Sequence, residues 1–116
     1  MGFGTMADLL RGDVYWADLE PVKGHEQAGR RPVLILSHPI FNSKSGTVIA
    51  VALTSSEPKV KFPLAFEIKT LDLPKRSWVK TSQIRVLSTL RLTSKLGRVD
   101  SKEVDRVVKG LNEIIG

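Results

Sequence analysis

The sequence predicts a mainly β domain of the β-rich α+β class: a small barrel followed by one C-terminal amphipathic helix. Three observations predict it. Short segments rich in β-branched and aromatic residues recur along most of the chain, separated by glycine, proline and asparagine turn signals. From residue 104 the apolar residues change to spacings of three and four, the period of a helix. The length of 116 residues corresponds to one domain that is large enough to bury a core.

The first strand is predicted at 14–19, a short segment rich in strand formers. The segment 20–31 has no apolar periodicity and contains a proline and two glycines, so it is predicted to be a loop. Pro32 then opens the apolar run 33–36, which is typical of a strand buried on both faces. Proline is tolerated at the first position of a strand because its missing N–H need not interrupt the ladder there.

The middle of the chain contributes two more strands. Turn residues at 42–46 lead into 47–54, which has the pattern of a second buried strand. The segment 55–63 carries two prolines and two lysines and is predicted to be a mobile basic loop. Residues 64–68 alternate between apolar and polar, as expected for a strand with one solvent-exposed face.

Two further strands are predicted at 77–81 and 83–87, and the same pattern is compatible with one bent strand. A shorter segment at 95–99 is another candidate. Five to seven strands at this spacing favour a small barrel over a parallel sheet.

The last segment has helical periodicity. Asp100 is a candidate N-cap, and Glu103, three positions later, is its candidate capping-box partner. Gly110 lies inside the predicted helix and costs about 1 kcal/mol relative to alanine. The apolar stripe that we expect to pack on the barrel consists of Val104, Val107, Val108, Leu111, Ile114 and Ile115.

The charge balance points to a polyanionic partner. The chain carries 18 Lys and Arg residues against 12 Asp and Glu residues, a formal net charge of +6. Nucleic acid or another phosphate-bearing molecule suits a small domain this basic, although solubility alone also produces such a balance.

Cysteine is absent from the sequence, which excludes disulfides, zinc–thiolate sites, iron–sulfur clusters and thiol nucleophiles. The two histidines, His25 and His38, have no suitable cluster of carboxylates beside them, so no metal site and no cofactor are expected.

No apolar run approaches the ~18 residues of a membrane-spanning helix, and the N-terminus lacks the features of a signal peptide. We therefore expect a cytoplasmic protein with no membrane partner. Residues 1–10 are expected to be an N-terminal extension, with Met6 a candidate natural start, and residues 11–116 to form a single domain.

Polar side chains are concentrated at 24–32, next to a predicted buried strand. His25 and Glu26 can titrate or form hydrogen bonds, and Gln27 can anchor the loop. Arg31 lies where the loop becomes a strand, and the following proline biases it toward extended geometry. An arginine held on a rigid strand end presents a planar fork of donors suited to phosphate. The alternative is a surface loop in which Glu26 pairs with one of the two adjacent arginines.

Together these residues resemble the MazF/PemK (Kid-like) toxins of bacterial type II toxin–antitoxin systems. The resemblance is strongest over GHEQAGRRPVLILS at 24–37. It covers roughly residues 11–115 in consistent order, so it is far more specific than any single short motif. The other segments that carry it are RGDVYW at 11–16, DLEPV at 18–22, FN at 41–42, VALT at 51–54 and QIR at 83–85.

The resemblance implies an SH3-like barrel with a C-terminal helix that works as a homodimer. It also implies an endoribonuclease that cuts single-stranded RNA, with mRNA as the expected target, at short sequences and without a metal. The ribose 2′-hydroxyl would attack the adjacent phosphate and leave a 2′,3′-cyclic phosphate and a 5′-hydroxyl. A cognate antitoxin with a disordered acidic tail is the expected protein partner, and the net charge of +6 suits such a tail.

Residue by residue, the family's arginine before the Pro-Val strand falls on Arg31, and its threonine at the end of the second buried strand falls on Thr54. Arg31 is suited to neutralise charge on the pentacoordinate phosphate, and Thr54 is suited to donate a hydrogen bond to the same oxygens. The alternative for Thr54 is a strand-end hydroxyl bonded to its own backbone.

His25 and Glu26 fall on family positions assigned to catalysis or RNA contact, with roles that differ among members. Glu26 is a candidate catalytic base or a loop-ordering acceptor. In some relatives a later strand supplies an arginine and an aspartate, and these positions are Lys80 and Ser82 here. Because serine cannot be an equivalent base at neutral pH, the weight shifts to the arginine and the threonine.

The remaining candidates are expected to contact RNA. Trp16 and Trp78 can stack bases, but their strand patterns favour core positions. The full set of expected RNA-binding residues is His25, Gln27, Arg30, Ser55, Lys59, Lys80, Ser82 and Gln83.

Two other functions are compatible with a small basic barrel. CcdB-type toxins of the same fold class bind DNA gyrase through aromatic and glycine residues at the extreme C-terminus, whereas this chain ends in NEIIG. A non-catalytic RNA-binding barrel would use its charge alone. Cleavage of RNA in the presence of EDTA separates these functions.

Overall fold

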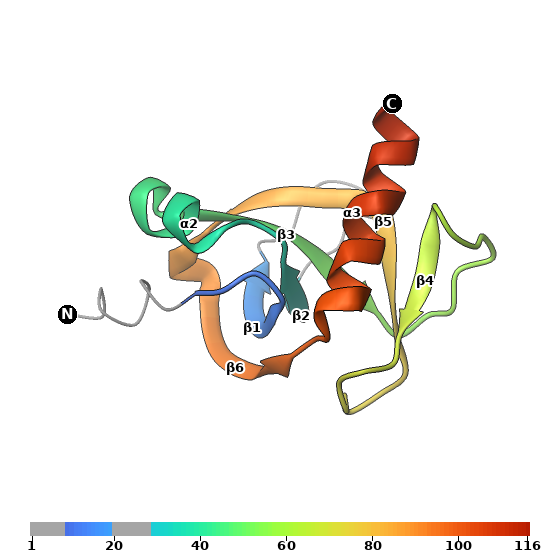
Figure 1. Ribbon diagram of the computed structural model, residues 1–116. Coiled ribbons are helices and arrows are strands. Elements are labelled where there is room, and N and C mark those ends of the chain that lie inside the picture. The colour runs from blue at the N-terminus through green and yellow to red at the C-terminus, as the bar shows by residue number, and fades with distance from the viewer. Residues whose placement is uncertain (1–8, 20–28) are drawn as a thin grey trace.

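The computed structural model describes residues 9–19 and 29–116, which form one six-stranded antiparallel sheet with two α-helices (Figure 1). The mainly β fold with a C-terminal helix is as predicted. The elements in chain order are β1 (Asp13–Leu19), β2 (Gly29–Ile35), α2 (Pro39–Ser45), β3 (Thr47–Thr54), β4 (Ala65–Ile68), β5 (Ser77–Ser88), the 3₁₀ helix η1 (Thr89–Arg91), β6 (Leu92–Arg98) and α3 (Ser101–Ile115).

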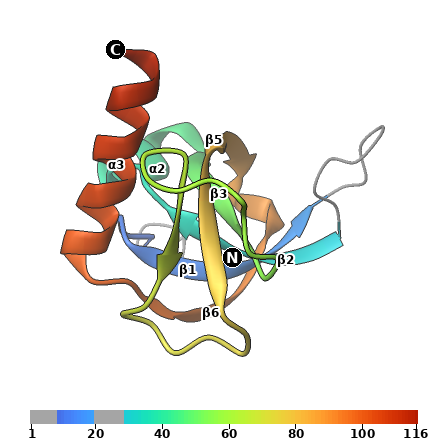
Figure 2. The same cartoon turned by 90° about the vertical axis from the view of Figure 1, so that its right-hand side faces the viewer.

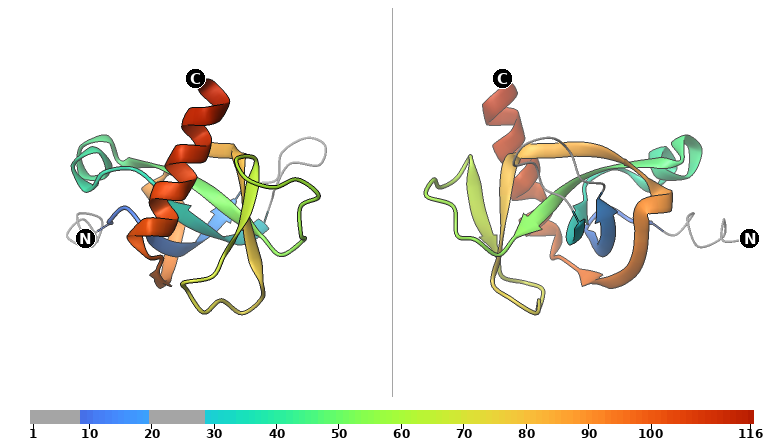
Figure 3. Two further views of the ribbon diagram at one scale, coloured as in Figure 1. Left: turned by 45° about the vertical axis from the view of Figure 1, so that its right-hand side comes forward. Right: turned by 180° about the vertical axis from the view of Figure 1, so that it is seen from behind.

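The sheet order is β4-β5-β3-β2-β1-β6, so β4 and β6 are its two edges. The sheet curls strongly, and β5 bends where its pairing with β3 shifts register between Val51 and Leu53 (Figures 1 and 3). The predicted segments 77–81 and 83–87 are therefore one bent strand. After the bend β5 still pairs with β3, whereas before it β5 lies between β3 and β4.

Alternation along β3 gives the protein two hydrophobic cores. Val51 and Leu53 face a core that α3 covers with Val104 and Val107. Side chains of the opposite parity face a second core on the other side of the sheet, which includes Leu9, Leu19, Val33, Ile35, Val48, Ala50, Ala52 and Leu87. The prediction that 47–54 is buried on both faces is confirmed, with the bounds of the strand unchanged.

The turn predicted at 42–46 is wrong, because residues 42–45 belong to helix α2 and Gly46 is its C-cap. His38 caps the helix, accepting a 3.1 Å hydrogen bond at Nδ1 from the backbone N–H of Ile40. Pro39 occupies the first turn, and Gly46 ends the helix with φ of 70°. A helix of seven residues is too short to show an apolar period, which is why only its end signals mark it in the sequence.

The expectation that Pro32 opens the second strand is also wrong, since β2 begins at Gly29. Residues 29–32 pair with β1 alone, and the ladder with β3 starts at Val33. The proline therefore lies where one side of β2 has no ladder to interrupt. Arg30 and Arg31 are consequently strand residues with fixed directions rather than loop residues.

Helix α3 begins at the predicted cap, since the Asp100 carboxylate accepts a hydrogen bond from the N–H of Lys102. The predicted capping box is wrong. The Glu103 carboxylate instead accepts from the backbone N–H groups of Lys69 and Thr70, and from the Thr70 hydroxyl at 2.6 Å. The Thr70 Oγ1 in turn accepts from the N–H of Asp100 at 2.9 Å. The Thr70 hydroxyl thus bridges Asp100 and Glu103, the two residues of the predicted capping box.

Gly110 has a packing reason inside the helix. A Cβ at this position would lie 2.9 Å from the carbonyl oxygen of Pro63, so α3 approaches the chain before β4 more closely than any other residue type allows. The described residues contain no helix long and apolar enough to cross a membrane.

Candidate active site

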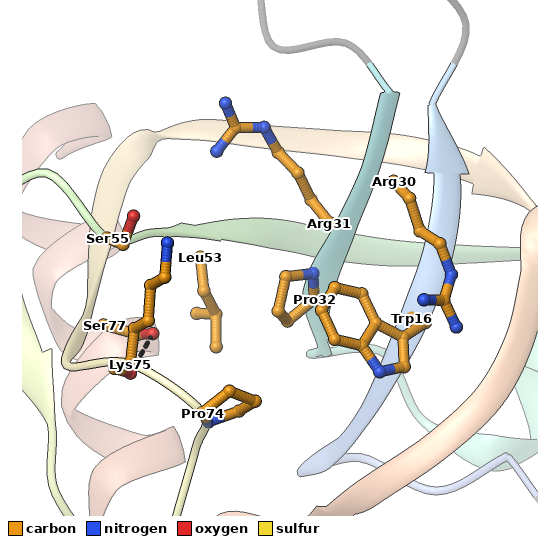
Figure 4. Close-up of a pocket in the computed structure, with 9 residues that line it drawn as sticks. All are labelled: Trp16, Arg30, Arg31, Pro32, Leu53, Ser55, Pro74, Lys75 and Ser77. Atoms are coloured by element: carbon orange, nitrogen blue, oxygen red, sulfur yellow. Dashed lines mark hydrogen bonds between the residues drawn. The ribbon is translucent and has the colours of Figure 1, made fainter.

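A cavity of about 280 Å³ opens where β1, β2 and the end of β3 meet the segment that leads into β5 (Figure 4). Figure 2 shows the neighbouring ends of β1 and β2 projecting together from the barrel on the side away from α3. The cavity, which we call the β2 pocket, is lined by Trp16, Arg30, Arg31, Pro32, Leu53, Ser55, Pro74, Lys75 and Ser77.

Trp16 and Pro32 form one wall of the β2 pocket, as cross-strand partners on β1 and β2. Trp16 is half-buried, and the guanidinium of Arg30 stacks over its indole at 4.4 Å from the ring centroid. The expectation of a core position is therefore wrong for Trp16. It is confirmed for Trp78, which is 7% exposed.

Arg31 is held in the middle of β2, opposite Ala17 of β1. Its Nε is buried and has no hydrogen-bond partner among the residues that the structure describes. Figure 4 shows its guanidinium extending away from Trp16. A buried donor without a partner is costly, so this nitrogen is prepared to bind an acceptor such as a phosphate oxygen.

Thr54 ends β3 and is 9% exposed. The β2–β3 register pairs Val33 with Ala52, and continuing it by two residues brings Thr54 opposite Arg31 on the same face of the sheet. The Thr54 Oγ1 accepts a 3.2 Å hydrogen bond from the N–H of Ser56. A hydroxyl bonded only to the local backbone was the alternative role for Thr54. This hydrogen bond, however, uses only a lone pair of the oxygen and leaves the hydroxyl proton free to be donated.

The opposite wall of the β2 pocket comes from residues that sequence reasoning missed. Pro74 and Lys75 precede β5, and the Ser77 hydroxyl donates to the carbonyl of Lys75 at 2.9 Å. In Figure 4 the Lys75 side chain extends toward Ser55. The only signal in the sequence was a basic Pro-Lys-Arg turn directly before a predicted strand.

Arg76 fixes this second wall from outside the pocket. Its guanidinium donates two 3.0 Å hydrogen bonds to the Glu67 carboxylate and lies 4.9 Å from the ring centroid of Trp78. The hydrogen bonds from Arg76 hold the pKa of Glu67 below its usual value of 4.5. The contact ties the turn before β5 to β4, one strand away.

Comparison with known proteins shows the family. Residues 10–115 match the family described as the PemK-like, MazF-like toxin of type II toxin–antitoxin systems. The chain belongs to this PemK/MazF toxin family. It is 42% identical over 105 residues to the endoribonuclease EndoA of Bacillus subtilis (strain 168), covering 89% of this chain and 90% of that protein.

Solved structures show the same fold. An endoribonuclease from a mycobacterial species, in complex with its cognate antitoxin, is 28% identical, with a TM-score of 0.76 over 93% of this chain and 95% of that one. MazF from Deinococcus radiodurans is 29% identical, with a TM-score of 0.75 over 93% of this chain and 96% of that one. The PemK/MazF match therefore extends from β1 to the end of α3.

The structure of this PemK/MazF toxin brings together only part of the predicted site. Arg30, Arg31 and Ser55 line the β2 pocket, and Thr54 directly precedes one of its lining residues. The predicted residues His25, Glu26 and Gln27 lie outside the described residues.

The other predicted RNA contacts do not line the β2 pocket. Lys59 lines a second, larger cavity of about 720 Å³ next to Trp78 and Arg106. Lys80, Ser82 and Gln83 are exposed on β5, with Lys80 opposite Ala65 of β4. No group of three or more His, Asp or Glu side chains gathers as a metal site within 9–19 and 29–116.

Proposed function

We propose that this PemK/MazF-family toxin is a sequence-specific endoribonuclease that cleaves single-stranded RNA without a metal, and that mRNA is its main target. The observation that carries the proposal is the buried, unpartnered Nε of Arg31 at the β2 pocket, in a chain that is 42% identical to an endoribonuclease. A charged donor of this kind is suited to an anionic acceptor, and the phosphodiester supplies one.

The proposed reaction needs only groups of the RNA and of the protein. The ribose 2′-oxygen attacks the adjacent phosphorus and gives its proton to a base. The bond from phosphorus to the 5′-oxygen then breaks, and that oxygen takes up a proton. The products are a 2′,3′-cyclic phosphate and a 5′-hydroxyl, with no net change in oxidation state.

Arg31 and Thr54 are the proposed stabilisers of the pentacoordinate phosphate. Their positions on one face of β2 and β3 allow a guanidinium and a hydroxyl to contact the same phosphate oxygens. Arg31 lies on β2, paired with Ala17 of β1, and Thr54 ends the buried strand β3, so the backbones that carry both donors are positioned before substrate binds. Glu26 is proposed as the base, with His25 and Gln27 as RNA contacts.

Cations around the β2 pocket are proposed to bind the flanking phosphates. Arg30 and Lys75 are both exposed and line the pocket. Of the remaining predicted contacts, Ser55 lies in the pocket itself, while Lys59, Lys80, Ser82 and Gln83 are proposed to follow the RNA away from the cut. Binding of this kind weakens steeply as salt rises.

The proposed partners are a second copy of the chain and an acidic antitoxin. The mycobacterial endoribonuclease has been solved with its cognate antitoxin. A separate structure of the Deinococcus radiodurans toxin, the MazE–MazF complex, is 27% identical to this chain. The net charge of +6 favours a disordered acidic tail, which we propose competes with RNA in the cytoplasm.

Exposed apolar residues support the proposed homodimer. One set lies near α2 and the end of β5, at the opposite end of the molecule from β4 (Figure 3), and comprises Ile40, Phe41, Val86 and Leu90. Ile114 and Ile115 at the end of α3 are also exposed. Sedimentation at micromolar concentration checks the assembly, and a stable monomer would contradict it.

The function is tested by incubating the purified protein with a long defined RNA, with and without EDTA. Cleavage that resists EDTA and leaves 2′,3′-cyclic phosphate and 5′-hydroxyl ends supports the proposal. Retention of RNA without cleavage indicates the non-catalytic barrel, and gyrase inhibition without cleavage indicates the CcdB-type function. End-sequencing of the fragments maps the cut site for the experiments below.

A further inference from the structure

We infer that the β2 pocket is a nucleobase subsite, in which one base of the RNA displaces Arg30 from the face of Trp16. The inference rests on the proposed function, because it assigns a part of the substrate to a cavity next to Arg31. It adds a specificity element to a site otherwise described by its phosphate chemistry.

The shape and lining of the pocket suit one flat ring system. Its volume of about 280 Å³ lies just below the ~300–1,000 Å³ typical of pockets for whole small ligands. Trp16, Pro32 and Pro74 supply apolar surfaces on facing walls, and Leu53 lies between them (Figure 4). A pocket for phosphate alone would have no use for so much apolar surface.

Trp16 is kept partly exposed, unlike the second tryptophan of the chain. It is half-buried, whereas Trp78 is 7% exposed in its strand. Trp16 lines the β2 pocket, and the Arg30 guanidinium covers one face of its indole. An aromatic face of this kind is the platform on which single-stranded nucleic acids stack their bases.

Arg30 occupies that face in the free protein but is weakly held there. Its guanidinium lies 4.4 Å from the centroid of the Trp16 ring, and the side chain is exposed. Its hydrogen bond to the Ser94 hydroxyl is long, at 3.5 Å. An exposed cation–π contact is weaker than base–aromatic stacking, so a base is expected to win the exchange.

The exchange links base binding to phosphate binding. Once displaced, Arg30 can turn its guanidinium to a backbone phosphate, beside Arg31 and Lys75 at the same pocket. A nucleotide that lacks its base leaves Arg30 stacked on Trp16. Removing one base therefore costs the stacking contact and one phosphate contact together.

The first test is a cycle between protein variants and abasic RNA. The probe is the mapped RNA made uncleavable by a 2′-deoxy substitution at the cut, with one abasic site placed in turn at each position near it. For the native protein, one abasic position should weaken binding on the order of 10- to 100-fold. In Trp16→Leu the abasic site at that position should no longer weaken binding more than abasic sites elsewhere. Trp16→Phe keeps an aromatic face and should retain most of the loss of affinity.

The second test is the salt dependence of binding. With intact RNA, Arg30→Gln should reduce the slope of log K against log salt by roughly 0.7, the value for one phosphate contact on a single strand. With RNA abasic at the sensitive position, native protein and Arg30→Gln should have equal slopes. Lys109→Gln, an exposed change on α3, is the charge-matched control and should not distinguish the two RNAs.

The outcomes separate the subsite from the proposed function. If native protein binds and cuts RNA but abasic costs are the same in Trp16→Leu as in native protein, the subsite is wrong and the nuclease stands. If the slopes of native protein and Arg30→Gln differ equally with both RNAs, Arg30 is not displaced by a base. If native protein neither binds nor cuts RNA, both proposals fail.

Discussion

The side-chain amide of Asn42 donates a 3.0 Å hydrogen bond to the carbonyl oxygen of Leu9 and so fastens α2 to the start of the described chain. The same amide donates to the carbonyl of Ser37 at 3.2 Å, and its oxygen accepts from the Ser37 hydroxyl. Asn42 is 1% exposed, and Leu9 is fully buried in the second core. The FN motif that contributed to the family resemblance thus includes a structural asparagine, at the far end of β3 from Thr54.

Asn42→Ala should lower the free energy of unfolding by about 2–3 kcal/mol, because two buried carbonyl groups lose their donor. Cleavage per folded molecule should be unchanged. Urea denaturation measures the loss, and Ser43→Ala, on the exposed side of α2, should stay within about 0.5 kcal/mol. A loss of cleavage in folded Asn42→Ala would mean that the residue belongs to the site.

Arg31→Ala should reduce cleavage on the order of 10²–10³-fold, because it removes charge stabilisation from the transition state. Stability should not fall, since its buried Nε has no partner among the described residues. Single-turnover cleavage of a defined RNA and thermal melting measure the two effects. Lys44→Ala, on α2, is the control for loss of a positive charge. Near-native cleavage by folded Arg31→Ala would remove Arg31 from the catalytic set.

Thr54→Val keeps the shape of the side chain and removes the hydroxyl. Cleavage should fall on the order of 10-fold to 100-fold, less than for Arg31, because a neutral donor is lost instead of a charge. Stability should fall by about 0.5–1.5 kcal/mol, since the N–H of Ser56 loses its acceptor. Thr54→Ser restores both functions of the hydroxyl. If the valine variant loses stability but cuts RNA normally, the hydroxyl serves only the backbone.

Gly110→Ala should destabilise the protein by about 1–3 kcal/mol, although alanine is the better helix former by about 1 kcal/mol. The added methyl would meet the carbonyl oxygen of Pro63 at 2.9 Å, and backbone atoms yield less than side chains. Asn112→Ala, on the exposed side of the same helix, isolates the helix propensity and should be neutral or slightly stabilising. A stabilising Gly110→Ala would show that α3 can shift away from the barrel without cost.

The Glu67–Arg76 contact should make stability depend on pH in the acid range. The pKa of Glu67 is lowered in the folded protein, so its contribution is present above about pH 4.5 and is lost as the pH falls through the lowered value. Native protein and Glu67→Gln should therefore differ in Tm at neutral pH and converge at acid pH. A difference that persists unchanged to low pH would mean that the hydrogen bonds do not depend on the charge of Glu67.

The strands were the most predictable part of this fold, because their signals are local. The segment 47–54 shows its burial in its own composition. The partner of Glu103 was not predictable in this way, because the capping box is a local pattern and Thr70 comes from a distant turn. The two predictions of element bounds that failed, at α2 and at Pro32, involve elements whose lengths are set by neighbours in space.

In the candidate site, too, contacts between distant segments were not predictable from local sequence patterns. Arg31 and Thr54 were found through a family resemblance, and the β2–β3 register gives them a shared face that no pattern in the residues expresses. Pro74 and Lys75 were missed, because they lie nearly sixty positions from Trp16 in the chain and only the folded sheet brings them to the same pocket.

The Asp100–Thr70–Glu103 cluster also decides how the barrel closes. Thr70 follows one edge strand, β4, and Asp100 follows the other, β6, and no strand pairing joins these edges among the described residues. Leu71 lies directly over Gly97 at the same seam, where a Cβ would approach its Cδ1 to 2.6 Å. The barrel is therefore closed between β4 and β6 by side-chain contacts and the N-terminus of α3. These two edge strands can separate there without breaking a single inter-strand hydrogen bond.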